Sequence, residues 1–429
     1  MTALRLDTAP GPALRGRLRV PGDKSISHRA LLLAARADGR SEITGLSTGL
    51  DVAATASAIA AFGAGVERSS PTALVVNGGP ARLGEPPTII DVGNSGTAIR
   101  LLAGWSAGVA GLSVLSGDAS IAGRPMDRVV EPLRSMGASI DGRAEGRFAP
   151  LVIRGARLHG IDYALPVASA QVKGAILLAA LSAEGQTTVR ETTPTRRHTE
   201  EMLSAAGADI TVSEGAVTLR PSALRSIDVA VPADPSQAAF WVVAATIVAG
   251  SDLLLEDVYL GAGRAGFVTV LQRMGADITL EAADPDRRTA DLRIRSAALQ
   301  ATEVAGPEVA GLIDEIPVLA VAAAFAAGTT VFSDAAELRV KESDRITTMT
   351  SELRAAGVAV VSHADGLEVS GSAGAPIPGG VIDSHGDHRV AMAVAVAALG
   401  ASGPVVINGW EAVATSYPGF EEDLHRCRS

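Results

Sequence analysis

The sequence predicts an α/β protein of two domains, each built from three copies of one repeated unit. Three observations support this prediction. The chain has 429 residues, which is enough for two domains of ordinary size. A helical run rich in Ala, Leu and Val, followed by Gly and a short β-branched stretch, recurs six times. Between these copies lies a second, amphipathic helical pattern.

The apolar helices come first in each repeat, and each is followed by a glycine. These glycines are spaced by about 70 residues, and they are Gly39, Gly111, Gly185, Gly250, Gly328 and Gly403. A glycine just past the last helical residue is typical of a helix C-terminus that turns into the left-handed conformation. We therefore expect these six glycines to cap the apolar helices.

The amphipathic helices come second in each repeat, and they are also expected to end in Gly. In "RVVEPLRSMGASID" and "GFVTVLQRMGADIT", apolar residues fall at helical spacing and charges occupy the other face. Each unit is thus predicted as strand–helix–strand–helix–strand–strand. A contiguous solenoid is the alternative, although solenoid repeats are usually only about 20–45 residues long.

The two ends of the chain predict the domain boundaries. The sixth copy of the amphipathic helix, "FEEDLHRC", stops before its closing strands, while the N-terminal "ALRGRLRV" has no unit of its own. We expect this N-terminal stretch to complete the last domain. The chain then crosses between domains near Pro21 and near "VPADPS" at 231–236. The predicted domains are a discontinuous domain, 1–20 plus 234–429, and an inserted domain, 21–233.

The composition excludes several classes of function. A net charge of −10 argues against binding to nucleic acid or to anionic membranes, and so against an RNA-end-processing enzyme with a related repeated fold. The one cysteine, Cys427, cannot form a disulfide within the chain or build a thiolate metal site. The N-terminus lacks the apolar region of a secretory signal, and the apolar runs are too short for a membrane span. We therefore expect a cytoplasmic protein.

Polar and basic residues gather just before the apolar helices, as in "PGDKSISHR", "DVGNSGTAIR" and "DSHGDHR". N-capping explains the Ser, Asp and Asn at these positions. It does not explain the five cations there, which are Lys24, Arg29, Arg100, Lys173 and Arg389. A helix N-terminus already favours anions through its dipole and free N–H groups. We therefore predict sites for phosphate or carboxylate that converge in the groove between the two domains.

Three further segments carry cations outside this pattern. They are "AGRPMDR" with Arg124, "PTRRHTE" with Arg196, and "ELRVKESDRI" with Lys341, Glu342 and Arg345. If the last segment is helical, Lys341 and Arg345 share one face. Glu342 is then either a solvated salt-bridge partner or, in a groove lined by cations, a working acid.

Eight motifs taken together resemble the 5-enolpyruvylshikimate-3-phosphate synthase family of enolpyruvyl transferases. They run in order from about Leu18 to Phe420, and they are "PGDKSISHRA", "GNSGTAIR", "GDASIAGRPM", "SAQVKGA", "TRRHTE", "DEIPVLA", "KESDR" and "GDHRVAMA". The resemblance implies a fold in which each domain has three βαβαββ units around a pseudo-three-fold axis, with the active site in the interdomain cleft.

The same resemblance implies a reaction. The enolpyruvyl group of phosphoenolpyruvate is transferred to the 5-hydroxyl of shikimate 3-phosphate, and phosphate is released. This is the step of the shikimate pathway, and so of chorismate and aromatic amino acid biosynthesis, that glyphosate targets. The resemblance implies no metal and no organic cofactor. We expect a monomer whose partners are these two small substrates, with no nucleic acid and no membrane.

The family's functional residues carry over by position. For shikimate 3-phosphate, the resemblance implies Lys24, Ser25, Arg29, Ser169, Ala170, Gln171, Arg196, Asp314 and Lys341. For phosphoenolpyruvate, it implies Lys24, Gly96, Arg124, Gln171, Arg345 and Arg389. It implies Glu342 as the acid that protonates the methylene carbon, and either Asp314 or Lys24 as the acceptor of the hydroxyl proton.

Two positions depart from the pattern of some family members. Ala170 stands where they carry a second Ser, so only its backbone can contribute to binding. Thr415 and Ser416 stand in "ATSYPGF", where they carry a Lys before the last segment.

Rival interpretations remain open. The sister transferase that acts on UDP-N-acetylglucosamine relies on a loop Cys, which "GDASIAGRPM" lacks. A non-catalytic homologue that binds metabolites is the other rival, although the set of charged motif residues is intact. Asp314 and Glu315 could simply be an N-cap pair. In "DSHGDH", the Asp and His side chains are metal-ligand types, but Arg389 beside them disfavours a metal site.

Overall fold

The backbone of the computed structural model, which describes residues 2–6 and 12–428, crosses between two compact units beside Pro21 and Pro232. Gly22–Val231 forms one unit, here called the inserted unit. Met1–Pro21 and Pro232–Ser429 form the other, here called the terminal unit. Residues 1 and 7–11 of the expected segment 1–20 lie outside the described residues.

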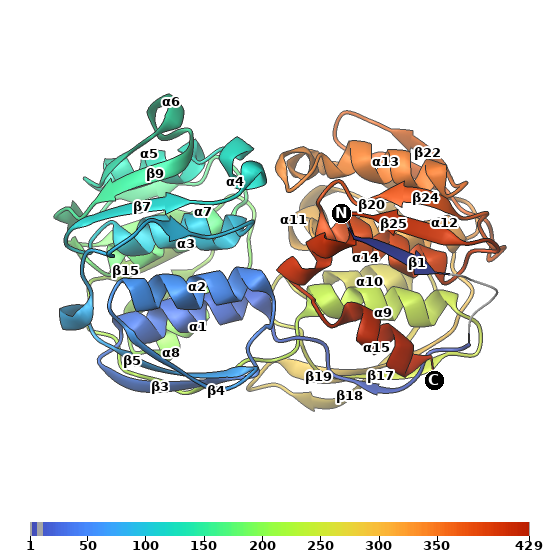
Figure 1. The fold of residues 1–429 in the computed structure, drawn as a ribbon, viewed down its shortest axis with the longest axis horizontal. Helices are drawn as coiled ribbons and strands as arrows, with labels where there is room; N and C mark the ends of the chain where they lie inside the picture. The colour runs from blue at the N-terminus through green and yellow to red at the C-terminus, as the bar shows by residue number, and fades with distance from the viewer. Residues whose placement is uncertain (1, 7–11, 429) are drawn as a thin grey trace. The chain divides into compact units, whose positions relative to one another are not determined.

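The inserted unit contains three four-stranded sheets of one topology (Figure 1). In each sheet a short strand runs parallel to the next, and two more strands continue the sheet antiparallel. The sheets are β16 (Val229–Ala230), β3 (Gly39–Thr44), β5 (Ala73–Gly78) and β4 (Gly65–Ser70); β6 (Ile90–Asp91), β7 (Leu112–Ser116), β9 (Phe148–Arg154) and β8 (Ser139–Gly142); and β11 (Asp162–Ala164), β13 (Thr187–Arg190), β15 (Ala216–Arg220) and β14 (Asp209–Ser213). A separate parallel pair joins β10 (Leu158–His159) and β12 (Ala183–Glu184).

Three apolar helices form the centre of the inserted unit, and three amphipathic helices accompany them. The apolar helices are α1 (Lys24–Arg36), α3 (Gly96–Ser106) and α7 (Ala170–Ala180). The amphipathic helices are α2 (Leu50–Ala61), α5 (Asp127–Ser135) and α8 (His198–Ala205), and the short turns are η1 (Pro80–Arg82), α4 (Ala119–Gly123) and α6 (Arg143–Gly146). Trp105 of α3 donates from Nε1 to the carbonyl of Leu32 at 2.8 Å, and Arg36 of α1 donates to the carbonyl of Trp105 at 2.8 Å. These two bonds join α1 to α3.

Two sheets of the terminal unit repeat the same four-stranded topology, and its third sheet has three strands among the described residues. Its sheets are β2 (Arg15–Leu18), β17 (Asp252–Tyr259), β19 (Thr289–Arg295) and β18 (Asp277–Asp284); β20 (Glu303–Val304), β21 (Thr329–Phe332), β23 (Leu367–Ser370) and β22 (Ala359–Ser362); and β24 (Gly380–Asp383), β25 (Val405–Asn408) and β1 (Ala3–Leu6). The apolar helices α9 (Pro235–Ile247), α12 (Ile316–Phe325) and α14 (His388–Ala398) pack against one another. The amphipathic helices are α10 (Gly266–Arg273), α13 (Arg345–Ala355) and α15 (Phe420–Cys427), and the short turns are η2 (Gly306–Glu308), α11 (Val309–Leu312), η3 (Ala336–Val340) and η4 (Trp410–Thr415).

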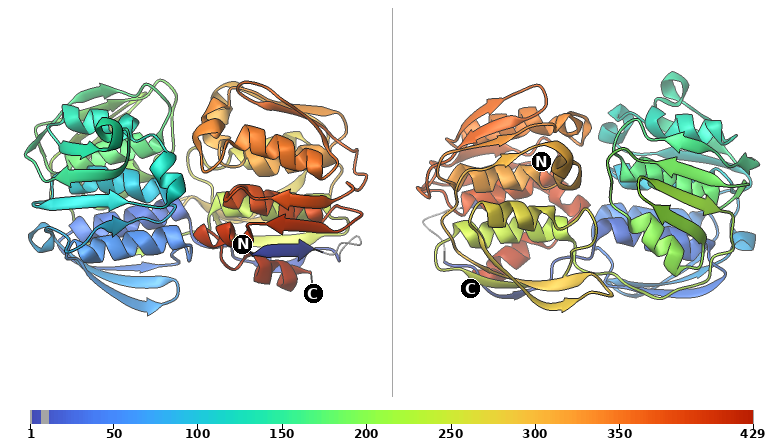
Figure 2. Two further views of the ribbon diagram at one scale, coloured as in Figure 1. Left: turned by 45° about the horizontal axis from the view of Figure 1, so that its top comes forward. Right: turned by 180° about the vertical axis from the view of Figure 1, so that it is seen from behind.

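The N-terminal residues join two different sheets of the terminal unit. β2, within the stretch "ALRGRLRV", runs parallel to β17. β1 lies before that stretch and runs antiparallel to β25, so the first described strand closes the last repeat (Figure 2). The closing strand of the sixth repeat is therefore Ala3–Leu6, whereas β2 adds a strand to another sheet of the terminal unit.

The glycines after the amphipathic helices cap these helices as predicted, whereas the glycines after the apolar helices do not. The glycines after the amphipathic helices are C-terminal caps with positive φ, and they are Gly63, Gly137, Gly207, Gly275 and Gly357. The glycines after the apolar helices lie further on, beside the next strand, so the expectation that they cap these helices is wrong. The chain leaves α1, α9 and α12 directly in an extended conformation at Ala37, Val248 and Ala326. After α3, α7 and α14 it keeps right-handed helical angles at the next residue, so no glycine in the left-handed conformation follows directly.

None of the helices among the described residues is both long and apolar enough to cross a lipid bilayer.

Gly104 tests the close contact of α3 with α7. A Cβ built at this position would overlap the backbone of Ala175, including its carbonyl oxygen. Because a backbone atom cannot move aside as a side chain can, Gly104→Ala should lower the free energy of unfolding by about 3 kcal/mol, at the upper end of the usual cost of overpacking. Thermal and urea denaturation followed by circular dichroism would measure this loss.

Gly84→Ala is the matched control in the same unit. A Cβ there meets nothing within 4 Å, and the backbone has no positive φ. We expect Gly84→Ala to change the free energy of unfolding by less than about 0.5 kcal/mol. Equal stability of the two variants would contradict the close packing of α3 on α7.

Candidate active site

The first turn of α1 fixes two cations. Asp23 caps the helix, accepting from the Ile26 amide at 2.8 Å. Lys24 follows and donates from Nζ to Asp51 Oδ2 of α2 at 2.9 Å. Arg29, one turn later, donates from Nη1 to the carbonyl of Ser25 at 2.9 Å. The basic residues at the start of α1 are thus held in defined positions.

Arg29 also links α1 to α8. Its Nε donates to Thr199 Oγ1 at 2.7 Å, and its side chain is buried. His28, between Lys24 and Arg29, is fully buried and its Nδ1 lies 2.7 Å from Thr55 Oγ1. Burial, followed by the charges of Lys24 and Arg29, holds the pKa of His28 well below its usual value. The ring is therefore neutral at physiological pH and belongs to the core.

The start of α3 brings Gly96 against Arg124. Ser95 caps α3, and Gly96 is its first residue. A Cβ at Gly96 would lie 2.7 Å from Cζ of Arg124, which follows α4. Any other residue at this position would therefore displace the guanidinium. The close approach of Arg124 to the start of α3 depends on the missing side chain of Gly96.

Gln171 connects the starts of α3 and α7. Arg100 of α3 donates from Nη1 to Gln171 Oε1 at 2.8 Å, and Gln171 donates from Nε2 to Thr97 Oγ1 at 2.9 Å. Ser169 caps α7, accepting from the Val172 amide at 3.3 Å. The predicted residues 169–171 therefore lie beside the start of α3.

The prediction that Lys173 belongs to an anion site is wrong. Its side chain is fully buried, and Nζ lies 2.8 Å from Glu191 Oε2 and 2.6 Å from Glu200 Oε1. Two carboxylates of the protein already surround this ammonium, and burial closes it to an external ligand. Arg196, in contrast, is half-buried in the loop that connects β13 to α8.

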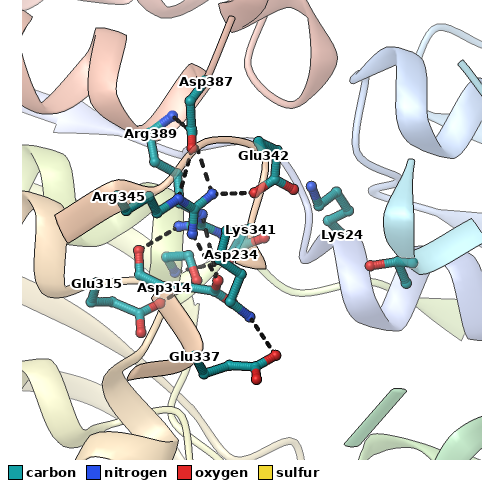
Figure 3. Close-up of polar contacts among 12 residues, drawn as sticks. Lys24, Asp234, Asp314, Glu315, Glu337, Lys341, Glu342, Arg345, Asp387 and Arg389 are labelled. Atoms are coloured by element: carbon teal, nitrogen blue, oxygen red, sulfur yellow. Dashed lines mark hydrogen bonds and ion pairs between the residues drawn. The ribbon is translucent and has the colours of Figure 1, made fainter. Parts of the chain in front are cut away.

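Arg345 is the centre of the site in the terminal unit (Figure 3). Only 1% of its side chain is exposed, and its Nε lies 2.8 Å from Oδ2 of Asp387, which is fully buried. Its Nη2 lies 2.5 Å from Glu342 Oε2. Burial alone would lower the pKa of Arg345, but the carboxylates of Asp387 and Glu342 outweigh burial and raise it. Arg345 is thus a permanent cation that holds Glu342.

Asp314 lies beside two guanidinium groups. Its Oδ1 is 3.4 Å from Arg345 Nη1 and 3.8 Å from Arg389 Nε, and its carbonyl accepts from Arg389 Nη1 at 2.9 Å. Glu315 occupies the N-cap position of α12, but its carboxylate accepts from Ser236 Oγ and lies 3.7 Å from Arg264 Nη1. The alternative of a simple N-cap pair therefore does not describe these two carboxylates.

The prediction that Lys341 and Arg345 share a helix face is wrong. η3 ends at Val340 and α13 begins at Arg345, so Lys341 and Glu342 lie in the turn between them. α13 begins only after Asp344, whose side chain caps the helix by accepting from the Thr347 amide at 3.1 Å. Burial holds the pKa of Lys341 below its usual value, although Asp314 and Glu337 oppose this effect.

Two carboxylates that hold the cations are not apparent from the sequence motifs. Asp51 binds Lys24 across 27 residues, and Asp387 binds Arg345 across 42 residues. Asp387 drew attention only as a possible metal ligand, and His385 of the same motif instead contacts Glu352 at 3.0 Å. Among the residues that the structure describes, there is no cluster of three or more side chains suited to a metal ion.

The structure thus groups the predicted site residues within each unit. In the inserted unit they lie at the starts of α1, α3 and α7, at the end of α4 and before α8; in the terminal unit they lie before α12, between η3 and α13, and at the starts of α13 and α14. Cations with neighbouring carboxylates suit the binding of phosphorylated and carboxylated molecules, and the transfer of protons to and from them.

Comparisons with known proteins agree with this chemistry. Residues 8–424 match the family described as EPSP synthase (3-phosphoshikimate 1-carboxyvinyltransferase). The chain is 50% identical over 431 residues to the 3-phosphoshikimate 1-carboxyvinyltransferase of Synechococcus sp. (strain JA-3-3Ab), covering 98% of this chain and 96% of the relative. It is 47% identical over 417 residues to the protein of the same name from Geobacter sp. (strain M21), covering 96% of each.

Solved structures confirm the predicted fold class. The EPSP synthase of Acinetobacter baumannii superposes with a TM-score of 0.88 at 41% identity, covering 99% of this chain and 98% of that chain. The enolpyruvyl transferase NikO of Streptomyces tendae superposes with a TM-score of 0.77 at 18% identity, covering 99% and 97% of the two chains. At that identity, the second likeness concerns the fold alone.

Asp387→Asn tests the buried ion pair, because Asn can still cap α14 but carries no charge. Burial alone would raise the pKa of Asp387, but the Arg345 guanidinium outweighs burial and holds it below its usual value. The charge therefore stabilises the fold fully above the unfolded pKa, about 4, and this contribution is lost as the pH falls through the lower folded pKa. We expect Asp387→Asn to lower the free energy of unfolding by about 3 kcal/mol at pH 7, and by less below pH 4.

Urea unfolding at neutral and acidic pH measures this difference, with Asp344→Asn as control. Asp344 also caps a helix and binds Arg339 at 2.6 Å, but 37% of its side chain is exposed. Its substitution should cost less than about 1 kcal/mol. Equal costs for the two variants, or a cost of Asp387→Asn that is the same at both pH values, would contradict the proposed strength of the Arg345–Asp387 pair.

Proposed function

Because the chain belongs to the EPSP synthase family, the 3-phosphoshikimate 1-carboxyvinyltransferases, we propose that its residues bind phosphoenolpyruvate and shikimate 3-phosphate as the motifs predict. The activity itself, that of an EPSP synthase in the shikimate pathway of aromatic amino acid biosynthesis, follows from family membership. What the proposal adds is the assignment of substrates and steps to particular side chains.

Shikimate 3-phosphate is assigned to residues at several helix starts. They are Lys24, Ser25, Arg29, Ser169, Ala170, Gln171 and Arg196 of the inserted unit, and Asp314 and Lys341 of the terminal unit. The α1 and α7 starts support this assignment, because free N–H groups and Lys or Arg side chains together suit a phosphate. Ala170, the first residue of α7, contributes only its backbone.

Phosphoenolpyruvate is assigned to a set richer in arginine. It contains Lys24, Gly96, Arg124 and Gln171 of the inserted unit, and Arg345 and Arg389 of the terminal unit. The guanidinium fork suits a ligand that carries both a carboxylate and a phosphate. The close approach of Gly96 and Arg124 supports the assignment, because it places a cation at the N-terminus of α3.

The contact between Glu342 and Arg345 carries the mechanistic proposal. In the protein alone, Arg345 binds the Glu342 carboxylate. An incoming phosphoenolpyruvate anion competes for the same guanidinium, and a carboxylate that loses its cation takes up a proton more readily. Substrate binding thereby prepares Glu342 as the acid. Asp387 meanwhile keeps Arg345 in place.

The reaction then proceeds by addition and elimination. Glu342 donates a proton to the methylene carbon of phosphoenolpyruvate, and C2 becomes cationic. The 5-hydroxyl of shikimate 3-phosphate forms a bond to C2 and releases its proton to Asp314 or Lys24. The Glu342 carboxylate then takes back a proton from the methyl group, the C2–O bond to phosphate breaks, and the enol ether forms. Arg and Lys side chains stabilise the charge on the leaving phosphate.

We further propose that the two compact units are the enzyme's two domains, with the boundaries 1–20 plus 234–429 and 21–233. The enzyme is also proposed to act as a monomer in the cytoplasm. One chain contains every residue assigned to the two substrates, which supports a monomer.

The substrate assignment predicts strict dependence on shikimate 3-phosphate. Release of inorganic phosphate from phosphoenolpyruvate should occur with shikimate 3-phosphate and not with UDP-N-acetylglucosamine. The segment "GDASIAGRPM" has no cysteine, and Cys427 is buried at the end of α15. A coupled phosphate assay with each acceptor decides the question. Turnover with the nucleotide sugar would show that the acceptor is wrongly assigned.

The two proposed proton-transfer carboxylates predict losses in kcat. Glu342→Gln and Asp314→Asn preserve shape but cannot transfer a proton, so each should lower kcat by about 100-fold or more. Glu337→Gln is a suitable control, because Glu337 is a neighbouring carboxylate 4.0 Å from Lys341 with no assigned chemical step. Stopped-time assays at saturating substrates measure all three. Near-normal kcat in both test variants would mean that the chemistry lies elsewhere.

A further inference from the structure

We propose that Glu191 and Lys173 are positioning residues for shikimate 3-phosphate, because their buried ion pair fixes the loop that carries Arg196. This inference rests on the proposed function, which assigns Arg196 to that substrate. Neither residue is among those assigned to the two substrates, and both lie in the inserted unit.

The loop 191–197 depends on side chains for its conformation. β13 ends at Arg190 and α8 begins at His198, so the segment between them has no regular secondary structure. Thr195 donates from Oγ1 to Glu191 Oε1 at 2.5 Å. The Glu191 carboxylate, at the start of the loop, is therefore bonded to Thr195, the residue directly before Arg196.

Lys173 fixes that carboxylate to the core of the unit. Nζ lies 2.8 Å from Glu191 Oε2 and 2.6 Å from Glu200 Oε1, and no part of the Lys173 side chain is exposed. An ammonium removed from water is costly unless it is paired at short range. If the Lys173 ammonium separated from either carboxylate, the cost of its burial would no longer be offset. The pairing therefore strongly favours one arrangement of α7, the loop and α8.

Other proposed ligands of shikimate 3-phosphate lie on α7 or contact α8. The Lys173 amide donates to the carbonyl of Ser169 at 3.1 Å, one turn back along α7. Thr199, adjacent to Glu200, accepts from Arg29 Nε at 2.7 Å. The buried ion pair is thus part of α7 and the loop, and it is linked to α1 through Thr199 and Arg29. Lys173 itself is buried and cannot touch the substrate.

Glu191→Gln in the full chain tests the proposal. Gln retains the shape of Glu191 and an oxygen that can accept from Thr195, but it removes the charge that binds Lys173. The Lys173 ammonium keeps Glu200 as its partner. We expect the Kd and KM for shikimate 3-phosphate to rise about tenfold, while kcat and the KM for phosphoenolpyruvate change less than about twofold. Titration calorimetry and steady-state kinetics measure the two effects.

Thr195→Val provides a second test that leaves the buried charges intact. It removes only the hydrogen bond between Glu191 and the loop, and it should raise the Kd for shikimate 3-phosphate about threefold. This variant keeps the inference testable if Glu191→Gln folds poorly, which thermal denaturation reveals. Asp162→Asn is the matched control, since it removes an exposed carboxylate that binds Arg190, next to Glu191, at 2.8 and 2.7 Å. It should leave the Kd unchanged.

A double-mutant cycle with Arg196→Ala identifies the path of the effect. If Glu191 acts by placing Arg196, then Glu191→Gln should raise the Kd less than about twofold once Arg196 is absent. The same fold loss with and without Arg196, or an unchanged Kd in both Glu191→Gln and Thr195→Val, overturns the inference. Failure of the wild-type protein to bind shikimate 3-phosphate would instead overturn the proposed function on which the inference rests.

Discussion

Six helices that are buried along most of their length constrain where this fold can place polar chemistry. Every residue of α12 is buried, and so is nearly every residue of α9. A helix that is apolar on all sides has no polar face to offer, so only its ends can carry charged side chains. Its N-terminus also favours anions through free N–H groups. Lys24 on α1 and Arg389 on α14 lie at such ends, where packing allows a charged side chain.

In the protein without substrate, these cations are paired with carboxylates of the protein itself. Asp51 binds Lys24, and Asp387, Glu342 and Asp314 surround Arg345. Gathering several cations without such partners would be costly. In the proposed mechanism, a substrate anion replaces Glu342 at Arg345. Asp387, which is fully buried, stays paired with Arg345 in that proposal.

Periodicity in the sequence was sufficient to predict the repeated fold, because the pattern depends on local spacing. The six apolar runs became α1, α3, α7, α9, α12 and α14, and the strands formed five four-stranded sheets of one topology and one three-stranded sheet among the described residues. The glycine pattern was harder to interpret. Capping requires a glycine directly after the helix, and only those after the amphipathic helices meet this condition.

The partners of the charged residues could not be predicted in this way. Asp387 lies 42 residues from Arg345, and local spacing gives no sign of a contact at that distance. Lys173 occupies the same type of position as Lys24 in the pattern, yet one is fully buried between carboxylates and the other is partly exposed. Sequence spacing predicts which helix end carries a cation, whereas its surroundings depend on tertiary packing.

The pairing of β1 with β25 has a consequence for the order in which the protein can fold. Ala3–Leu6 is synthesised long before its partner Val405–Asn408. The inserted unit, Gly22–Val231, is contiguous and lies between the two strands in the sequence, so it can become compact before the second strand is made. Until then, β1 must wait with its backbone N–H and C=O groups uncovered. Chaperone protection of this short segment would therefore matter most during synthesis.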